Sequence, residues 1–156
     1  MVADQLGMIL QDLAQLINTP GLELDKNNTC LLRLPSGMAI QIEQDKSDEN
    51  LIVGIEIGPA PAGAFRSILF RRALQINGLP PPRYGVLAYS RQIKSLIMFE
   101  KLPIETVSAG DIAQLMELMI PKAQMWVDAL ETGQIPEIPS APASPEEGGN
   151  LFGLKH

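Results

Sequence analysis

The sequence is poor in the residues from which most catalytic and metal sites are built. Its 156 residues include one cysteine, Cys30, and one histidine, His156, which is the last residue. A structural zinc site takes four Cys or His ligands, and a Ser or Cys nucleophile usually works with an imidazole base, so we expect no metal site and no such catalytic site. A single cysteine cannot form an intramolecular disulfide and is typical of a reducing compartment. We expect Cys30 to act as a small buried hydrophobic side chain.

Other signals of ligand chemistry are also missing. The glycines fit neither the P-loop spacing nor the dinucleotide-binding spacing, so we expect no nucleotide cofactor. A formal net charge of −6 argues against a protein whose affinity depends on neutralising nucleic-acid phosphates. The start of the chain shows no basic segment followed by an apolar run, and no stretch is long enough to span a bilayer. These absences predict a cytoplasmic protein with no membrane insertion.

What the chain does have is patterned apolar sequence. Hydrophobic residues make up 46% of it, enough for one folded domain, which we place at residues 1–132. Residues 133–156 differ in character, because prolines recur at every third position and two adjacent glutamates follow, the prolines being Pro136, Pro139, Pro142 and Pro145. This repeat is typical of an extended polyproline II segment. We expect a disordered acidic tail that acts as a solvated spacer, and a docking ligand is the alternative.

Three segments have the apolar spacing of helices: Val2 to Asn18, Ala62 to Asn77, and the stretch from a Ser108 cap to Leu130. The middle segment carries two apolar stripes. Phe65, Ile68, Leu69, Ala73 and Ile76 share one side, and Phe70 and Leu74 point roughly opposite. One core can bury only one stripe, so the second predicts either another subunit or a covering loop of the same chain. Arg72 falls inside the first stripe, where it must extend to solvent or pair with a carboxylate across an interface.

Five segments alternate with the period of strands, and they run Cys30–Leu34, Met38–Glu43, Leu51–Ile57, Tyr84–Tyr89 and Ser95–Leu102. Pro35-Ser36-Gly37 suits a type I turn and predicts an antiparallel hairpin between the first two. The stretch Leu96–Phe99 is apolar on both faces, so we expect it to be central or covered by something outside the domain. Together the elements predict an α+β fold with three helices and a twisted, mainly antiparallel five-stranded sheet.

An enzyme that uses two carboxylates remains a separate hypothesis. Such a site needs two acids that converge from core elements, and Glu56 with Glu100 is the one pair that the pattern offers. Arg66, Arg71 and Arg72 form a basic patch, which we interpret as salt bridging within a dimer.

The order helix, three strands, helix, two strands, helix resembles that of the class I type III secretion chaperones of the CesT and SycE kind. Within this order the resemblance rests on Ala73–Leu79 closing the second helix, Gly85–Leu87 opening the fourth strand, Leu96–Phe99 running into Leu102–Ile104, and Trp126 near the end of the last helix. It covers Met1 to about Thr132. The triple proline Pro80–Pro82 and the proline-rich tail are departures from the family pattern.

The resemblance implies an ATP-independent, bacterial cytoplasmic homodimer that binds the amino-terminal segments of secreted effectors, with secretion-apparatus components as further partners. It implies a dimer interface on the second helix and the strand after it, with Phe65, Ile68, Leu69, Arg72, Ile76, Val86 and Leu87. It also implies a cargo surface near Leu10, Leu13, Ile17, Leu31 and Ala39. The alternative function is a small α/β adaptor that recruits partners through its tail.

Overall fold

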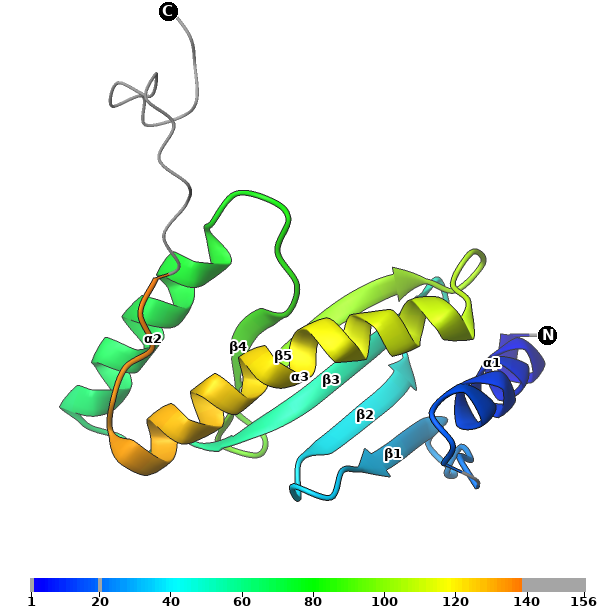
Figure 1. The fold of residues 1–156 in the computed structure, drawn as a ribbon, viewed down its shortest axis with the longest axis horizontal. Helices are drawn as coiled ribbons and strands as arrows, with labels where there is room; N and C mark the ends of the chain where they lie inside the picture. The colour runs from blue at the N-terminus through cyan, green and yellow to red at the C-terminus, as the bar shows by residue number, and fades with distance from the viewer. Residues whose placement is uncertain (1, 20, 139–156) are drawn as a thin grey trace, which may run out of the picture.

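The computed structural model describes residues 2–19 and 21–138 (Figure 1). The chain runs α1 (Val2–Leu16), β1 (Thr29–Arg33), β2 (Ala39–Gln44), β3 (Asn50–Pro59), α2 (Ala64–Asn77), β4 (Val86–Ser90), β5 (Ser95–Pro103) and α3 (Ala109–Thr132). The strands form one five-stranded sheet in the order β1-β2-β3-β5-β4, and each neighbouring pair is antiparallel. The predicted fold class and element order are therefore confirmed, with strand ends shifted by a residue or two.

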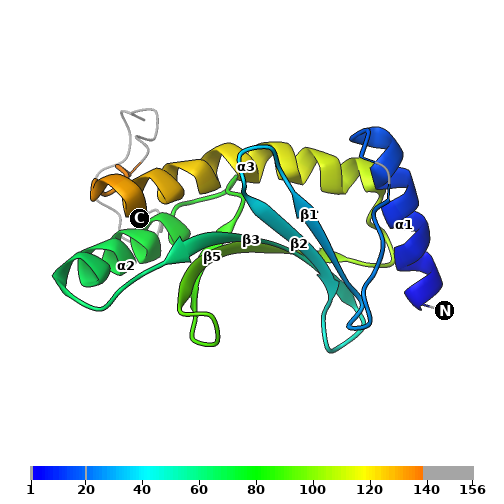
Figure 2. The same ribbon diagram turned by 90° about the horizontal axis from the view of Figure 1, so that it is seen from below.

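The helices are distributed unevenly around the sheet. α3 lies along one face, α1 packs against α3 at the β1 side, and α2 lies beyond β4 at the other end (Figures 1 and 2). No helix of the described residues covers the opposite face, which Figure 2 shows as the concave side of a curved sheet. The fold therefore has a packed face and an uncovered face built from the same strands.

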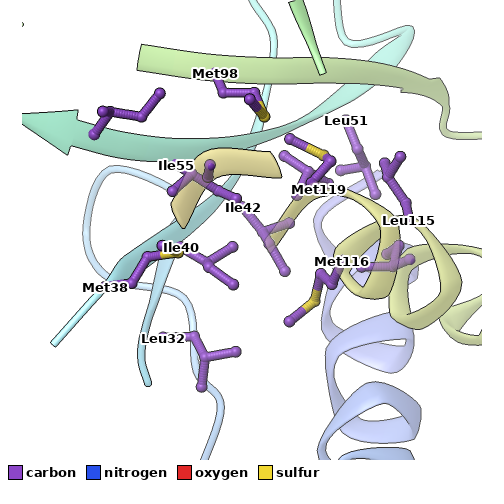
Figure 3. Close-up of a cluster of buried hydrophobic side chains, with 14 of the residues drawn as sticks. Leu32, Met38, Ile40, Ile42, Leu51, Ile55, Met98, Leu115, Met116 and Met119 are labelled. Atoms are coloured by element: carbon purple, nitrogen blue, oxygen red, sulfur yellow. The ribbon is translucent and has the colours of Figure 1, made fainter. Parts of the chain in front are cut away.

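The core fills the space between the sheet and α3. Strand side chains that point toward α3 meet Leu115, Met116 and Met119, and those labelled in Figure 3 are Leu32, Met38, Ile40, Ile42, Leu51, Ile55 and Met98. Each is buried, and full burial of such a side chain contributes about 1.5–3 kcal/mol. Cys30 is also buried in this core, as predicted. Burial, and to a smaller extent the Asp25 carboxylate, raises the pKa of its thiol.

Local sequence signals fix both ends of α3. The Ser108 hydroxyl accepts a hydrogen bond from the Asp111 amide at 3.1 Å, and the Asp111 carboxylate accepts one from the Ser108 amide at 2.9 Å. This reciprocal capping box satisfies two amides that a helix start otherwise leaves unpaired. The helix continues through the exposed Pro121 and ends at Gly133, whose left-handed φ of 77° suits glycine. Trp126 is buried in the core.

The end of α2 is held by the side chain of its last residue and not by the glycine that follows. Gly78 has a right-handed φ of −85°, so it does not form a left-handed cap. Asn77 has the special role instead: its side-chain amide donates to the Leu87 carbonyl at 2.8 Å, and its side-chain oxygen accepts from the Leu87 amide at 2.9 Å. The Asn77 side chain therefore pairs with the backbone of β4 as a neighbouring strand would.

The body of the fold continues past residue 132. Ile135 is half-buried against the core, Pro136 is buried, and the Arg72 guanidinium donates to the Pro136 carbonyl at 2.6 Å. We call residues 134–138 the strap, because they lie against α2. Arg72 thus has a hydrogen-bond partner in its own chain, and its pairing with a carboxylate of a second copy stays a prediction. The rest of the predicted tail, residues 139–156, lies outside the described residues.

We expect Asn77→Ala to lower the free energy of unfolding by about 1–3 kcal/mol, because it leaves two backbone groups of the buried Leu87 without their partners. Guanidinium unfolding followed by the fluorescence of the single, buried Trp126 measures this. The control is Ser67→Ala on the exposed side of the same helix, where we expect a change within about 0.5 kcal/mol. Equal effects of the two substitutions would contradict the role given to Asn77.

Candidate binding surfaces

The uncovered sheet face carries one row of residues that crosses all five strands. The strand registers place Leu31 opposite Gln41, Gln41 opposite Gly54, Gly54 opposite Phe99, and Phe99 opposite Val86. Because side chains alternate between the faces of a strand, the residues two positions away on each strand point the same way. Ile52 and Glu56 therefore flank Gly54 along β3, and Ile97 lies beside Phe99 on β5.

This face is hollowed into a groove of about 510 Å³. We call it the sheet groove, and its lining residues are Leu31, Ala39, Gln41, Glu43, Ile52, Gly54, Ile55, Glu56, Ser90, Gln92, Ile93, Ile97 and Phe99. Most of the lining is apolar, and its two ionisable side chains, Glu43 and Glu56, are both acidic. Such a surface suits a polypeptide segment that brings apolar side chains and positive charge.

The two carboxylates of the sheet groove are held by neutral neighbours. Gln41 donates to Glu43 at 3.4 Å, and the hydroxyl of the buried Ser95 donates to Glu56 at 3.3 Å. These contacts orient the carboxylates without neutralising them, so both charges face an incoming partner.

The catalytic pair considered from the sequence does not form. Glu56 faces the sheet groove, whereas Glu100 has the orientation of Met98, two residues earlier on the packed face. The Glu100 carboxylate accepts a hydrogen bond from the Gly85 amide at 2.7 Å, which holds the segment that enters β4. The two acids lie on opposite faces of the sheet and cannot act on one substrate.

A lysine of α3 also holds the segment that leads into β4. The Lys122 ammonium donates to the Tyr84 carbonyl at 2.9 Å and to the Gly85 carbonyl at 3.4 Å. Burial lowers the pKa of Lys122, against an opposing effect of the Glu100 carboxylate. Lys122 and Glu100 therefore fix where β4 begins, and neither points to a reaction. Among the residues that the structure describes, no group of three His, Cys, Asp or Glu side chains could hold a metal ion.

α2 offers a second candidate surface. Leu69, Ala73 and Ile76 face the core, while Ile68 and Leu74 are 51% and 71% exposed. The two-stripe pattern is therefore present, but Ile68 belongs to the exposed side and not to the buried stripe in which the sequence pattern placed it. The exposed Arg71 lies between the two apolar side chains along the helix.

Phe70, the other member of the second stripe, is covered by its own chain. Its ring lies 5.2 Å from that of Tyr89 on β4, and the Arg66 guanidinium lies within 6 Å of both ring centres, at 5.8 and 5.6 Å. Such cation–π contacts join α2 to β4. Arg66 also donates to the Ala60 carbonyl at 3.4 Å, so this arginine, like Arg72, is engaged within the protomer.

The site residues expected from the sequence divide into accessible and buried sets. Of the dimer residues, Ile68 is exposed and Phe65 and Val86 are half-buried, while Leu69, Ile76 and Leu87 belong to the core and Arg72 bonds to the strap. Of the cargo residues, Leu31 and Ala39 line the sheet groove and Ile17 is half-buried, while Leu10 and Leu13 are buried in the core. The buried members offer no side-chain surface to a partner.

The groove also contains residues that no sequence pattern assigned to a binding surface: Ile52, Gly54, Ile93, Ile97 and Phe99. The sequence did contain a signal for three of them. Ile97 and Phe99 belong to a run that is apolar on both faces, and Ile52 is an apolar residue on the outer face of a strand whose other face is already apolar. β5 is central in the sheet, as that pattern predicted, and its outer side chains line the groove.

Comparisons with solved structures find the same fold. One similar structure is the HopA1–SchA chaperone–effector complex, with a TM-score of 0.67, 16% identity, and coverage of 81% of this chain and 96% of that one. The ExsC–ExsE complex matches with a TM-score of 0.63, 13% identity, and 82% and 95% coverage. The ExoU–SpcU complex from the type III secretion system of Pseudomonas aeruginosa matches with a TM-score of 0.60, 18% identity, and 78% and 96% coverage.

A search among curated proteins found no match. In the part of the chain that the structure describes, no helix is long and apolar enough to cross a bilayer. The family model for the Tir chaperone protein (CesT) family matches residues 8–127, from α1 to the last turns of α3. This match confirms the resemblance that the order of the elements predicted. The chain belongs to the CesT family of Tir chaperone proteins.

Proposed function

We propose that this chain is a dimeric, ATP-independent chaperone of the bacterial cytoplasm that binds the amino-terminal segments of type III secreted effectors. The observation that carries the proposal is the sheet groove, an apolar hollow on the uncovered sheet face whose lining includes two carboxylates and no cationic side chain. Family membership supports the class of function, and the similar structures include complexes named as chaperone with effector. No catalytic step belongs to the proposal, because the groove holds a chain and does not transform it.

Binding an extended segment requires a large contact. A segment that becomes ordered on binding loses conformational entropy, so many apolar side chains must be buried to offset that loss. The sheet groove supplies apolar side chains from four strands and from the β4–β5 turn, with Leu31 at one side and Ile93 at the other. The proposal includes no nucleotide, because the glycines fit neither the P-loop spacing nor the dinucleotide-binding spacing.

The β1 edge extends this surface. Leu34 donates to the Met38 carbonyl at 2.9 Å, so by the alternation of an antiparallel pair the backbone groups of Leu32 bond to β2 and those of Leu31 and Arg33 point away from it. An effector segment that leaves the sheet groove over Leu31 can therefore continue as a strand along β1. The β4 edge is less open to strand addition, because the Asn77 side chain already bonds to the outward backbone amide and carbonyl of Leu87.

Self-association is assigned to α2. Ile68 and Leu74 are the large apolar side chains that this helix leaves exposed, and Val86 on the neighbouring β4 is half-buried. A second copy that packs the same surface against this one would bury all three in a two-fold interface. The proposal keeps Phe65, Ile68 and Val86 from the residues expected from the sequence and adds Leu74.

We expect Leu31→Asp to reduce effector binding by at least about tenfold, because it removes a groove side chain and adds a third carboxylate. The tagged protein would be purified from the bacterium that encodes it, and bound polypeptides identified and quantified by mass spectrometry. Since Leu31 is 54% exposed, folding should be unaffected. Met125→Asp on α3, at a similar 51% exposure outside the groove, is the control and should keep the effector. Loss of effector from both variants, or from neither, would contradict the groove assignment.

We expect wild-type protein to have twice the protomer mass of 17.0 kDa by light scattering, and Ile68→Asp to shift it to the monomer. A carboxylate at the centre of an apolar interface would be desolvated without a partner. Leu69→Asp is unsuitable for this test, because Leu69 is fully buried in the protomer and its replacement should unfold the chain. Met125→Asp again serves as the control and should remain dimeric. A dimer that survives Ile68→Asp would place the interface elsewhere.

Two truncations separate the chaperone from the adaptor. Removal of residues 139–156 should leave effector binding unchanged, because the sheet groove and the strap both remain. Removal of residues 134–156 also deletes the strap, and it should lower the thermal midpoint because Ile135 and Pro136 no longer cover α2. A protein that recruits partners through its proline-rich tail would lose them when residues 139–156 are removed. Calorimetry and the pull-down described above measure the two effects.

A further inference from the structure

Gly54 lies at the centre of the sheet groove. It occupies the middle position of the row that crosses all five strands, between Gln41 on β2 and Phe99 on β5. A glycine leaves a gap where every other member of the row has a side chain. We propose that this gap is a notch that receives one large apolar side chain of an extended effector segment, with a basic residue on either side of it. This proposal rests on the function proposed above.

The fold does not itself require glycine at position 54. A Cβ built there would meet the Met98 carbonyl oxygen at 3.9 Å and the Gln41 carbonyl oxygen at 4.0 Å, which are ordinary contacts. Its φ is not in the left-handed range that side chains avoid, unlike those of Gly37 and Gly85. A glycine within a strand usually lowers stability and often marks close approach of a ligand or another backbone. The space above Gly54 therefore has a binding role.

The walls of the notch are apolar on three sides. Ile52 lies two residues before Gly54 on the same face of β3, and Phe99 and Ile97 lie on β5. Strands are about 4.8 Å apart and residues two positions apart on one strand are separated by about 6.7 Å, so these side chains border a space of side-chain size. An aromatic or large aliphatic side chain would fill it.

The negative charge of the groove determines which effector residues flank the side chain that enters the notch. Glu43 lies opposite Ile52, and Glu56 follows Gly54 by two residues, so the carboxylates stand on opposite sides of the notch along β3. The geometry of a sheet separates them by about 14 Å, and an extended chain covers about 13–14 Å in four residues. Arg33 and Lys101 project from the same face but do not line the groove. An effector segment of five residues matches this spacing when its first and last residues are basic, its third residue is large and apolar, and its second and fourth residues are of any type.

Two synthetic peptides test the notch. Both carry this pattern within a glycine–serine context, one with phenylalanine and the other with alanine at the central position, and calorimetric titration gives their affinities. We expect wild-type protein to bind the phenylalanine peptide about tenfold more tightly than the alanine peptide. Gly54→Val should abolish that preference, because its side chain fills the notch, while its thermal midpoint should not fall. Glu43→Gln combined with Glu56→Gln should weaken both peptides equally.

The control is Gly7→Ala on α1, which adds a Cβ where nothing lies within 4 Å and should retain the preference. If wild-type protein binds neither peptide, or binds both equally, or if Gly54→Val keeps the preference, the notch proposal is overturned. Those results would leave the proposed function in place if Leu31→Asp still releases the natural effector and Met125→Asp does not. Failure of the wild-type protein to retain any effector would instead overturn both.

Discussion

The structure depends on one constraint: a five-stranded antiparallel sheet that has helices for only one of its faces. The packed face of the sheet lies against α3, and α1 packs against α3 in turn. This packing buries Met98, Leu51 and their neighbours, which accounts for the stability of the protomer. The central strands β3 and β5 are apolar on the outer face as well, with Ile52, Ile97 and Phe99. An antiparallel sheet commonly exposes one face to water, but that face is then usually polar. An apolar outer face on central strands therefore indicates a surface that a partner covers.

The two proposed interfaces lie on different elements and meet at Val86, which belongs both to the row on the uncovered sheet face and to the proposed dimer surface. α2 lies beyond β4 (Figure 1), and Asn77 and Arg66 attach it there through Leu87 and Tyr89. Because Asn77 fills the outward backbone groups of Leu87, the β4 edge is protected from strand addition at that position. The groove and the β1 edge remain for an extended segment.

Sequence alone predicted the features that local signals control. The element order, the Leu34–Met38 turn and the Ser108 cap each follow from a few adjacent residues, and all three are present. Features that depend on distant residues were not predictable in the same way. The family resemblance placed Leu10 and Leu13 at a cargo surface, yet both are buried in the core on a helix that packs against α3, a contact between the two ends of the domain. The strap bonded to Arg72 from a position 64 residues away is a second example.

The packed and the uncovered faces are linked through the composition of the core. Met38, Met98, Met116 and Met119 lie between the sheet and α3 (Figure 3), where methionine adapts its shape more readily than branched residues do. Met98 precedes Phe99, so a change in strand curvature at the groove moves both side chains together. Flexible thioethers can follow that movement and keep the core filled, whereas a core of isoleucine and valine would lose contacts. A sheet that receives an effector segment on its uncovered face would thus benefit from an adaptable layer on its packed face.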